Sequence, residues 1–383
     1  MYMRIKKWIL TFFQEPYWCL IFAGIVGLLC IKILPPVPVI SDFKDYDDIA
    51  LHIVSTGEFR TISNEEIIYP PLYPYFLSAI YIGLGYNYNF VYFIQFLLLG
   101  GIAGTFFVIA KKYFSFSTLL ASTLALAILL WPYTLLYSFV LSNEILFMFF
   151  LSLSAFYFLK FISEKKKTDV LLSGTLVAFA VLTRPVALLL PLWVFIGLYI
   201  FKKIKVIELE KEHFRKGVFI FLLFVALLLP WTLYVKEKFN RFIPVASNLS
   251  AVFSKANKTF EYDPTLASKN TTSALLKAKI KNLYLFWNPG ASGYHVEILK
   301  NKIPHASFLL WCYRIVFVTF VVLGLFSLKF IKKKKEVAVL FSIILYFWAL
   351  HSVLFPFPRY TLPIMPFVIM LAFYTLLQFK RNA

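Results

Sequence analysis

The sequence predicts an all-α polytopic membrane protein. Of its 383 residues, 60% are hydrophobic and 20% are aromatic, whereas only 15% are charged, and the mean hydropathy is +0.76. Such a composition is typical of chains whose helices lie in a bilayer, where each backbone polar group must be satisfied within its own helix. We therefore expect many membrane-spanning helices and no large soluble domain.

Ten apolar helices are expected to span the membrane, because a span needs about 17 to 25 apolar residues. Val170–Phe201 is too long for one span, and Thr183-Arg184-Pro185 interrupts it, so we expect two short helices that meet at Arg184. The other eight segments are Tyr17–Leu34, Val91–Ala110, Ser117–Tyr137, Asn143–Phe161, Gly217–Val235, Phe308–Phe330, Glu336–Phe355 and Thr361–Phe379.

The apolar segment Leu72–Leu84 is shorter than these spans. Thirteen helical residues rise only about 20 Å, whereas the hydrocarbon core is about 30 Å thick. We therefore expect this segment to be interfacial or re-entrant rather than to cross the membrane.

Clusters of Lys and Arg predict the orientation of the chain. The net charge is +20, and the basic residues gather at the ends of apolar segments, in Lys111-Lys112, Lys165–Lys167, Lys202–Lys216, Lys332–Lys335 and Lys380-Arg381. If Leu72–Leu84 does not cross, all five clusters lie on the cytoplasmic side with both termini, as the positive-inside rule requires. The charge is then a topology signal, and no nucleic-acid partner is expected. Abundant Lys, Ile, Phe and Asn favour a bacterial inner (plasma) membrane.

Three regions follow from this topology. Residues 1–235 form a transmembrane core whose acidic first outer loop covers 35–73, residues 236–306 form an outer (periplasmic) cap, and residues 307–383 return to the membrane. Cys19, Cys30 and Cys312 lie in or beside apolar segments, so we expect reduced thiols. The five histidines show no metal-ligand spacing, which disfavours a zinc site.

The first outer loop holds seven of the nineteen acidic residues. Asp42, Asp45 and Asp48 recur at spacings of three, which predicts a short helix along the membrane surface, capped by Ser41 and ended by Gly57. Its apolar stripe, expected to face the membrane, is Tyr46, Ile49, Ala50 and Ile53. We expect Asp42 to be a catalytic base; the alternatives are Asp45, Asp47 or Asp48 as the base, or acids that only stabilise the helix start.

Three further charged residues belong to the same outer face. Glu144 opens an apolar span, where it is either a solvated helix-start residue or part of a site. Arg184 and Arg359 suit a phosphate through bidentate hydrogen bonds, and the alternative is contact with lipid headgroups. His351 lies close to Arg359 in the sequence and is a further candidate.

Aromatic residues accompany these charges. Tyr46, Tyr69, Tyr73, Tyr75, Trp131 and Trp231 are expected to form an interfacial belt. Stacking on the face of a sugar is a second role that the sequence does not separate from the first.

Five short motifs resemble one known family. They are Asp42-x3-Tyr46-x3-Ala50 followed by Gly57, Tyr69-Pro-Pro-Leu-Tyr-Pro74, Ser142-Asn-Glu144, Leu182-Thr-Arg-Pro185 and Arg359-Tyr-Thr-Leu-Pro363. In this order they resemble the GT-C glycosyltransferases of the protein-mannosyltransferase and aminoarabinose-transferase type (glycosyltransferase families 39 and 83). The resemblance implies a GT-C fold, a sugar donor on a polyprenyl phosphate, Asp42 as catalytic base, and Glu144 as the second acid of the superfamily.

The activity implied is an inverting transfer of a hexose or pentose. Arg184 or Arg359 would neutralise the lipid phosphate, and Glu144 would orient the acceptor or hold a divalent cation (Mg²⁺ or Mn²⁺) beside Asp42. The remaining supporting residues are Asp45, Tyr46, Tyr73 and His351. The acceptor is lipid A or core, a polysaccharide, or a protein. The expected partners are therefore the polyprenyl-phosphate sugar, this acceptor and membrane lipids.

Two other functions stay open. A lipid-linked saccharide transporter or flippase is typically built from repeats with charges deep in its spans, whereas here no repeat is evident and the charges lie at helix ends. A polysaccharide polymerase or ligase would carry important arginines in a long outer loop, and Lys236–Pro304 contains only Arg241.

Overall fold

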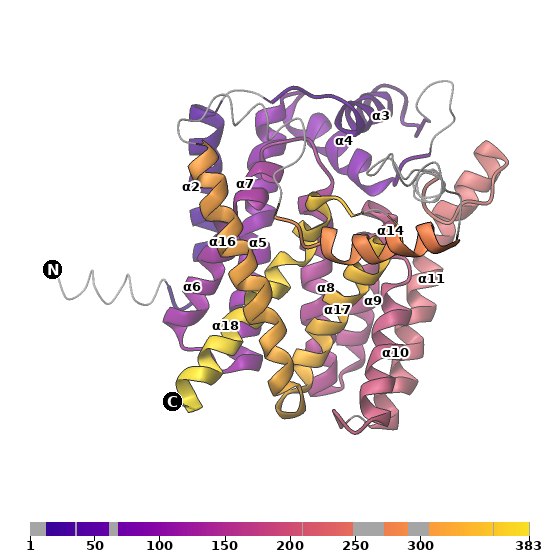
Figure 1. Cartoon of the computed structure of the whole chain (residues 1–383). Coiled ribbons are helices and arrows are strands. Elements are labelled where there is room, and N and C mark those ends of the chain that lie inside the picture. Colours follow the sequence, from indigo (N-terminus) through magenta and orange to yellow (C-terminus); the bar gives the residue numbers. More distant parts are fainter. Residues whose placement is uncertain are drawn as a thin grey trace.

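A computed structural model of the chain describes residues 13–34, 37–60, 68–208, 210–247, 272–289, 306–354 and 356–382. These residues form a helical bundle, and the described ranges contain no strand (Figure 1). The predicted all-α class is confirmed. The α-helices are α2 (Trp18–Ile33), α3 (Asp42–Thr56), α4 (Leu72–Leu84), α5 (Tyr88–Phe114), α6 (Thr118–Leu129), α7 (Pro132–Ser138), α8 (Glu144–Glu164), α9 (Lys167–Thr183), α10 (Leu190–Lys203), α11 (Lys211–Phe239), α14 (Thr272–Leu285), α16 (Ala306–Phe326), α17 (Lys335–Val353) and α18 (Met365–Asn382). Three 3₁₀ segments join them: η2 (Pro185–Ala187), η3 (Ser327–Lys333) and η4 (Pro358–Ile364).

Each of the ten predicted spans coincides with a helix or a pair of helices. Seven described helices are long and apolar enough to cross a membrane, and an eighth is obtained if α6 and α7 form one bent span. α2 and α9, with 16 and 17 residues, are shorter. The protein thus has a membrane-protein bundle, and the count of ten crossings stays a prediction.

One predicted break is confirmed, and one break was not predicted. α9 ends at Thr183 and η2 begins at Pro185, so the interruption at Arg184 is confirmed. Ser117–Tyr137, predicted as one span, is instead two helices bent by 56°. The bend follows from Pro132, which cannot donate a helical hydrogen bond and begins α7.

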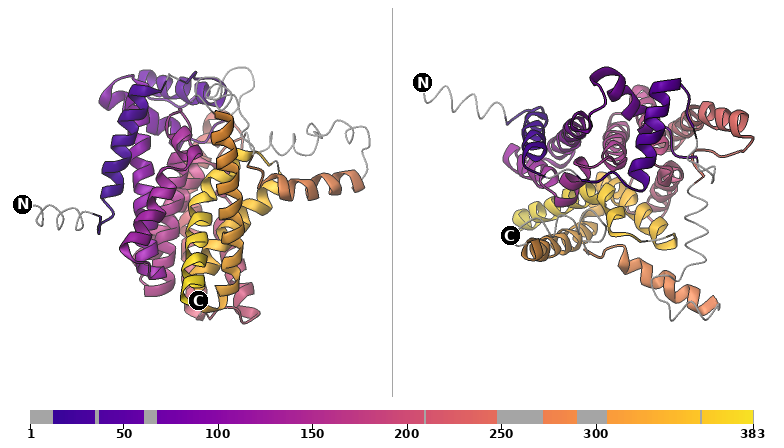
Figure 2. Two further views of the ribbon diagram at one scale, coloured as in Figure 1. Left: turned by 60° about the vertical axis from the view of Figure 1, so that its left-hand side comes forward. Right: turned by 90° about the horizontal axis from the view of Figure 1, so that it is seen from above.

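One end of the bundle is covered by α3 and α4, and we call it the capped end. Seen from above, several bundle helices appear end-on, whereas α3 is seen along its length (Figure 2). α4 has the predicted bounds and is a short helix of 13 residues, and that it does not cross the membrane stays a prediction. α3 begins at Asp42 and ends at Thr56, and the φ of +76° at the following Gly57 favours glycine.

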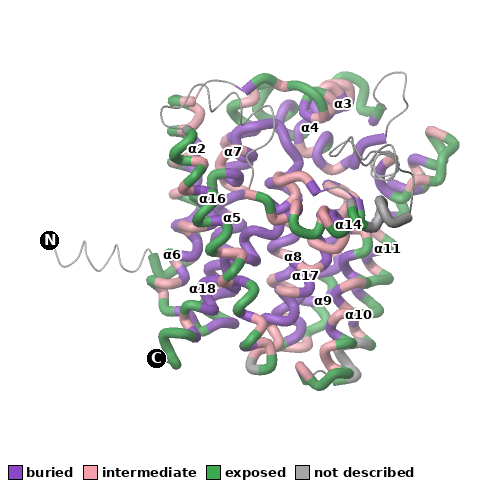
Figure 3. Tube along the Cα trace, viewed as in Figure 1, coloured by how far each residue is buried: buried purple, intermediate pink, exposed green. Residues whose placement is uncertain are grey.

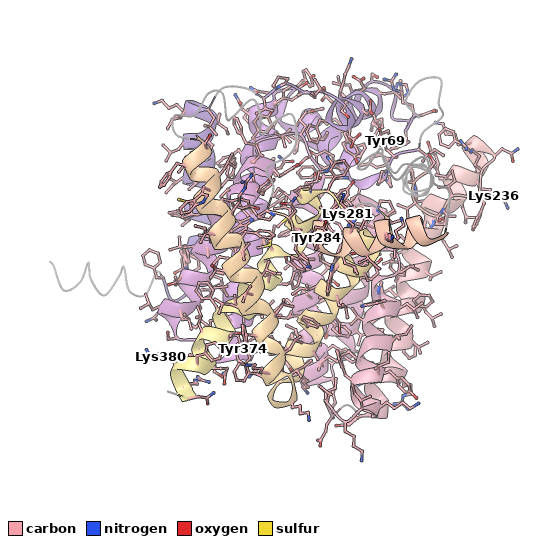
Figure 4. The ribbon with its side chains drawn as sticks, viewed as in Figure 1. Tyr69, Lys236, Lys281, Tyr284, Tyr374 and Lys380 are labelled. Atoms are coloured by element: carbon pink, nitrogen blue, oxygen red, sulfur yellow. The ribbon has the colours of Figure 1, made fainter. Side chains whose placement is uncertain are left out.

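The predicted basic clusters gather at the opposite end, which we call the basic end. Lys112 lies 2.5 Å from Glu164, Lys165 pairs with Glu210 at 2.5 Å, and Lys335 donates to the carbonyl of Ile162. Arg381 donates to Ser115 O, so the end of the last helix joins this cluster. Lys380 lies here, far from Tyr69 at the capped end (Figure 4).

Burial separates inner from outer helices. Buried residues concentrate in α5, α8, α17 and α18, whereas α16 and α11 have largely exposed surfaces (Figure 3). The exposed residues of α16 include Phe308 and Trp311. Large apolar side chains on an outer surface are typical of helices that face lipid.

α2 packs closely on α5 because small residues lie at the contact. A Cβ on Gly100 would lie 2.8 Å from the carbonyl oxygen of Cys19, and a Cβ on Gly27 would lie 2.8 Å from Phe96. Only glycine allows this approach, as is common between membrane helices. The three cysteines are free, as predicted.

α14 lies across the bundle direction rather than along it (Figure 1), with Lys281 and Tyr284 on it (Figure 4). Asn282 and Lys279 donate hydrogen bonds to the carbonyls of Ser352 and Val353 at the end of α17. α14 is the helix of the predicted cap that lies wholly within the described ranges, and residues 248–271 and 290–305 of the cap lie outside them.

The predicted orientation of α3 is wrong. Its stripe of Tyr46, Ile49, Ala50 and Ile53 is buried against the protein rather than exposed to the membrane, because α4 packs on it. Ser41 precedes the helix as predicted, yet its side chain makes no capping hydrogen bond. The predicted aromatic belt is also wrong for Trp131, Trp231 and the tyrosines 46, 69 and 73, which are buried, whereas Tyr75 is 40% exposed.

Candidate active site

A cavity of about 120 Å³ opens near the capped end, where α3, α8, η2, α17 and η4 meet. It brings together parts of all five motifs that carried the family resemblance. Its lining residues are Asp42, Phe43, Tyr46, Pro70, Asn143, Glu144, Arg184, Pro185, Val186, His351, Leu354, Arg359 and Tyr360.

Asp42 faces Arg359 in this cavity. Asp42 is the first residue of α3, and Arg359 is the second residue of η4, more than 300 positions later. The distance from Asp42 Oδ2 to Arg359 Nη2 is 3.7 Å, and the side chains are 49% and 31% exposed. A charge pair of this length and exposure is weak, so both groups can make other contacts.

Glu144 and Arg184 form a second pair that is closer and more buried. Glu144 Oε1 lies 2.6 Å from Arg184 Nη1, and their side chains are only 3% and 12% exposed. Arg184 occupies the break between α9 and η2 with an extended backbone, which directs it away from either helix axis. Its guanidinium carbon also lies 5.9 Å from the ring centres of Phe147 and Tyr360.

Asn143 connects three elements of the site. Its Nδ2 donates to the hydroxyl of Tyr46 on α3 at 2.8 Å and to the carbonyl of Thr183 at the end of α9 at 3.1 Å. Asn143 precedes α8, so these bonds fix Glu144 relative to both neighbours. Sequence reasoning gave Asn143 no role, although it lies inside the Ser142-Asn-Glu144 motif.

Tyr46 lies in the cavity wall as a neutral phenol. Burial, with the nearby Asp42 carboxylate as a smaller cause, raises the pKa of Tyr46 well above its usual value. Its oxygen accepts from Asn143, and its own proton remains available for a hydrogen bond. Tyr46 can therefore donate to a polar ligand in the cavity.

Tyr360 and His351 form an aromatic wall. Their rings stack with centroids 4.4 Å apart and an interplanar angle of 18°. The guanidinium carbon of Arg359 lies 5.5 Å from the centre of the Tyr360 ring. Sequence reasoning selected His351 but missed Tyr360, although Tyr360 directly follows Arg359 in the last motif.

Two predicted site residues do not line the cavity. Asp45 accepts a hydrogen bond from the Tyr69 hydroxyl at 2.5 Å. Burial, and then this bond, raise the pKa of Tyr69 above its usual value. Tyr73 is fully buried and donates to Gln95 Oε1 at 2.9 Å. Both residues support the wall behind Tyr46, since the rings of Tyr69 and Tyr73 each pack edge-on against it.

Asp47 and Asp48 also lie outside the lining. The carboxylate of Asp47 is buried and accepts from three tyrosines, Tyr81 at 2.6 Å, Tyr86 at 2.9 Å and Tyr88 at 2.7 Å. Asp47 therefore anchors α3 to α4 and to the start of α5. Of the four candidate bases, Asp42 is the one that lines the cavity.

The backbone directly before Asp42 is strained. Ser41 has φ +55° and ψ −140°, a combination that L-residues rarely adopt. Strain of this kind concentrates at functional sites, where the surrounding structure maintains it. The strained residue directly precedes Asp42, which lines the cavity.

The lining does not fit a divalent cation. Mg²⁺ and Mn²⁺ need several oxygen ligands in a defined geometry, and each carboxylate of the cavity already faces a guanidinium. Among the described residues there is no group of three or more His, Cys, Asp or Glu side chains that could hold a metal.

Comparison with known proteins identifies the fold. The sequence model of the dolichyl-phosphate-mannose-protein mannosyltransferase family matches residues 69–231, less than half of the chain. That region contains Glu144 and Arg184 but neither Asp42 nor Arg359. No curated protein sequence matches the chain.

Solved structures extend the likeness to almost the whole chain. ArnT from Cupriavidus metallidurans bound to undecaprenyl phosphate has a TM-score of 0.63 at 14% identity, over 94% of this chain and 59% of that one. The same protein in the apo state has a TM-score of 0.61 at 13% identity, over 97% and 60%. The oligosaccharyltransferase AglB from Archaeoglobus fulgidus, in complex with an inhibitory peptide and a dolichol-phosphate, has a TM-score of 0.61 at 13% identity, over 96% and 50%.

The chain therefore has the GT-C fold of membrane glycosyltransferases. Its resemblance to the protein-mannosyltransferase and aminoarabinose-transferase type is confirmed by the family match together with the fold. The chain spans between half and about 60% of the length of these solved proteins.

Proposed function

We propose that the chain is an inverting glycosyltransferase that moves a sugar from a polyprenyl-phosphate donor to a hydroxyl group of a cell-envelope acceptor. The observation that carries this proposal is the presence of Asp42, Arg184 and Arg359 in one cavity. Transfer from a phosphate-linked donor needs a base for the attacking hydroxyl and positive charge for the departing phosphate. The cavity supplies both.

Asp42 is the proposed base, because its half-exposed carboxylate can reach a hydroxyl that enters from solvent. It takes the proton of the acceptor hydroxyl while that oxygen forms a bond to the anomeric carbon. The bond from this carbon to the phosphate oxygen breaks, and its electron pair leaves with the polyprenyl phosphate. A single displacement inverts the anomeric centre.

The other lining residues act on the two substrates. Arg184 and Arg359 stabilise the negative charge of the lipid phosphate, and Glu144 fixes Arg184 beside the reacting atoms. Tyr46 donates a hydrogen bond to a substrate, and the stacked rings of His351 and Tyr360 present an aromatic face to the sugar. The lipid phosphates bound in the structures of ArnT and AglB support this class of donor.

The proposed orientation places the capped end outside the membrane. The basic clusters meet at the other end, and the positive-inside rule predicts that such an end is cytoplasmic. Both termini then lie in the cytoplasm of a bacterial inner membrane. The acceptor is a glycan, lipid or protein of the outer side, such as lipid A or core.

The proposal is tested with the purified protein in vesicles that contain radiolabelled polyprenyl-phosphate sugars and a cell-envelope fraction. We expect label to move to an envelope acceptor. Asp42→Asn lowers this rate about 100-fold or more, the range typical of a lost general base. Asp48→Asn, which removes the same charge from the same helix outside the cavity, retains the rate.

Three results would overturn the proposal. One is normal transfer by the Asp42→Asn protein, and a second is no consumption of any lipid-linked sugar by the wild-type protein. The third is movement of an intact lipid-linked sugar across the bilayer without bond formation, since this would make the protein a transporter.

A further inference from the structure

The two carboxylates and two guanidiniums that line the cavity sum to zero net charge when no substrate is bound. They are the carboxylates of Asp42 and Glu144 and the guanidiniums of Arg184 and Arg359. Glu144 pairs most closely with Arg184 and Asp42 with Arg359, and the charge of Glu144 also acts on Arg359. A phosphate that binds either arginine therefore competes with the carboxylate beside that arginine.

The two pairs differ in how readily they separate. Arg184 and Glu144 are 2.6 Å apart and almost fully buried, so separating them would remove the closest counter-charge of a buried carboxylate. Arg359 and Asp42 are 3.7 Å apart, beyond normal hydrogen-bond length, and both are partly exposed. Arg359 is thus the arginine that can change partners.

We propose that Arg359 exchanges Asp42 for the phosphate of the lipid-linked donor, and that this exchange releases Asp42 to act as the base. The inference rests on the proposed function and deepens it. Arg359 holds the carboxylate of Asp42 until the phosphate takes its place, so donor binding and base release become one event. Arg184 stays with Glu144 and contributes a fixed positive charge.

The exchange makes the carboxylate of Asp42 a competitor of the phosphate for one guanidinium. Removing that carboxylate should therefore tighten the binding of polyprenyl phosphate, even though the same substitution stops catalysis. A residue with only a structural role would not show this opposite effect on binding. Equilibrium binding of polyprenyl phosphate, the leaving product, is the direct measurement.

Polyprenyl phosphate is titrated into purified full-length protein in detergent, and its dissociation constant is measured for wild type, Asp42→Asn, Asp48→Asn, Arg359→Gln and the double variant Asp42→Asn/Arg359→Gln. We expect Asp42→Asn to bind about three- to fivefold more tightly, the upper scale of a partly exposed ion pair. Asp48→Asn, the matched control for loss of one negative charge on α3, should stay within about twofold.

The double variant separates exchange from simple charge repulsion. If Arg359 is the shared partner, the gain from Asp42→Asn disappears when Arg359 is Gln. If Arg359→Gln binds below detection, the double variant should do so as well. A gain of equal size without Arg359, or recovered binding in the double variant, overturns the exchange.

The same data distinguish the inference from the proposed function. Wild-type protein that binds polyprenyl phosphate, with no tighter binding by Asp42→Asn, overturns the exchange and leaves the proposed function standing. Wild-type protein that does not bind polyprenyl phosphate overturns both. All variants are compared at equal monodispersity on a sizing column, so that a misfolded variant is recognised.

Discussion

Arg184 Nη1 lies 2.6 Å from Glu144 Oε1, and this buried pair joins the start of α8 to the break between α9 and η2. Neither element alone accounts for the pair, because Glu144 begins one helix and Arg184 lies between two others, 40 residues further along the chain. The pair therefore has a structural effect that is separate from any contact with substrate.

Glu144→Gln should destabilise the protein by about 3 to 5 kcal/mol, the cost of leaving one partner of a buried pair uncompensated. Thermal unfolding in detergent measures the loss. The double variant Glu144→Gln/Arg184→Gln removes both charges and should lose less than the sum of the two single variants. Unchanged stability of Glu144→Gln would contradict the pair seen here.

Asn143 is expected to support activity through Tyr46. Asn143→Ala removes the donor to the Tyr46 hydroxyl and to Thr183 O, with a stability loss of about 1 to 3 kcal/mol for the acceptors left unpaired. We expect the transfer rate to fall about tenfold or more, because a misplaced wall residue weakens the fit of the reacting groups. The vesicle assay measures the rate.

Tyr46→Phe is the matched variant for this prediction, since it keeps the ring and removes the hydroxyl. If Asn143 acts by positioning that hydroxyl, the double variant Asn143→Ala/Tyr46→Phe should be hardly slower than the slower single variant. Fully additive losses would show instead that the two residues act independently.

Local signals predicted the parts of the fold that depend on neighbouring residues. The break at Arg184 follows from Pro185, the end of α3 follows from Gly57, and the short helix Leu72–Leu84 follows from its length. The basic clusters meet at one end because each follows or precedes a span. Asp42, Glu144, Arg184, His351 and Arg359 were all selected from sequence, and all line one cavity.

Long-range contacts could not be predicted in this way. The three tyrosine partners of Asp47 lie 34 to 41 positions away. Contacts over such a separation are not indicated by the periodicity of a helix or a strand. The buried face of α3 was assigned to the membrane because an amphipathic pattern does not tell lipid from protein. Tyr73 was selected for its motif, whereas the structure pairs it with Gln95 in the core.

Asp47 is expected to hold α3 on the bundle. Asp47→Asn removes a charged acceptor of three tyrosine hydroxyls, at about 1.5 to 3 kcal/mol for each hydrogen bond lost. The free energy of unfolding should fall, and protease should cut α3 faster at the capped end. Asp48→Asn is the control and should stay within about 0.5 kcal/mol of wild type. Equal effects of the two substitutions would rule out the anchor.

Tyr69 should stabilise the folded protein at neutral pH, and this contribution to the free energy of unfolding should decrease at high pH. Burial and the hydrogen bond to Asp45 raise the pKa of Tyr69 in the folded state, so the folded chain keeps this proton when the unfolded chain releases it. The contribution of Tyr69 is then complete below about pH 10, the unfolded value, and declines as the pH rises further. The melting temperature of wild type should exceed that of Tyr69→Phe at pH 7 to 9, and the difference should shrink between pH 10 and 11.

Asp45→Asn removes the charged acceptor and leaves Tyr69 in place. In the Asp45→Asn background, the effect of Tyr69→Phe on the melting temperature should therefore be smaller already at pH 7. A difference between wild type and Tyr69→Phe that stays constant through pH 11 would show that the Tyr69 hydrogen bond does not stabilise the capped end.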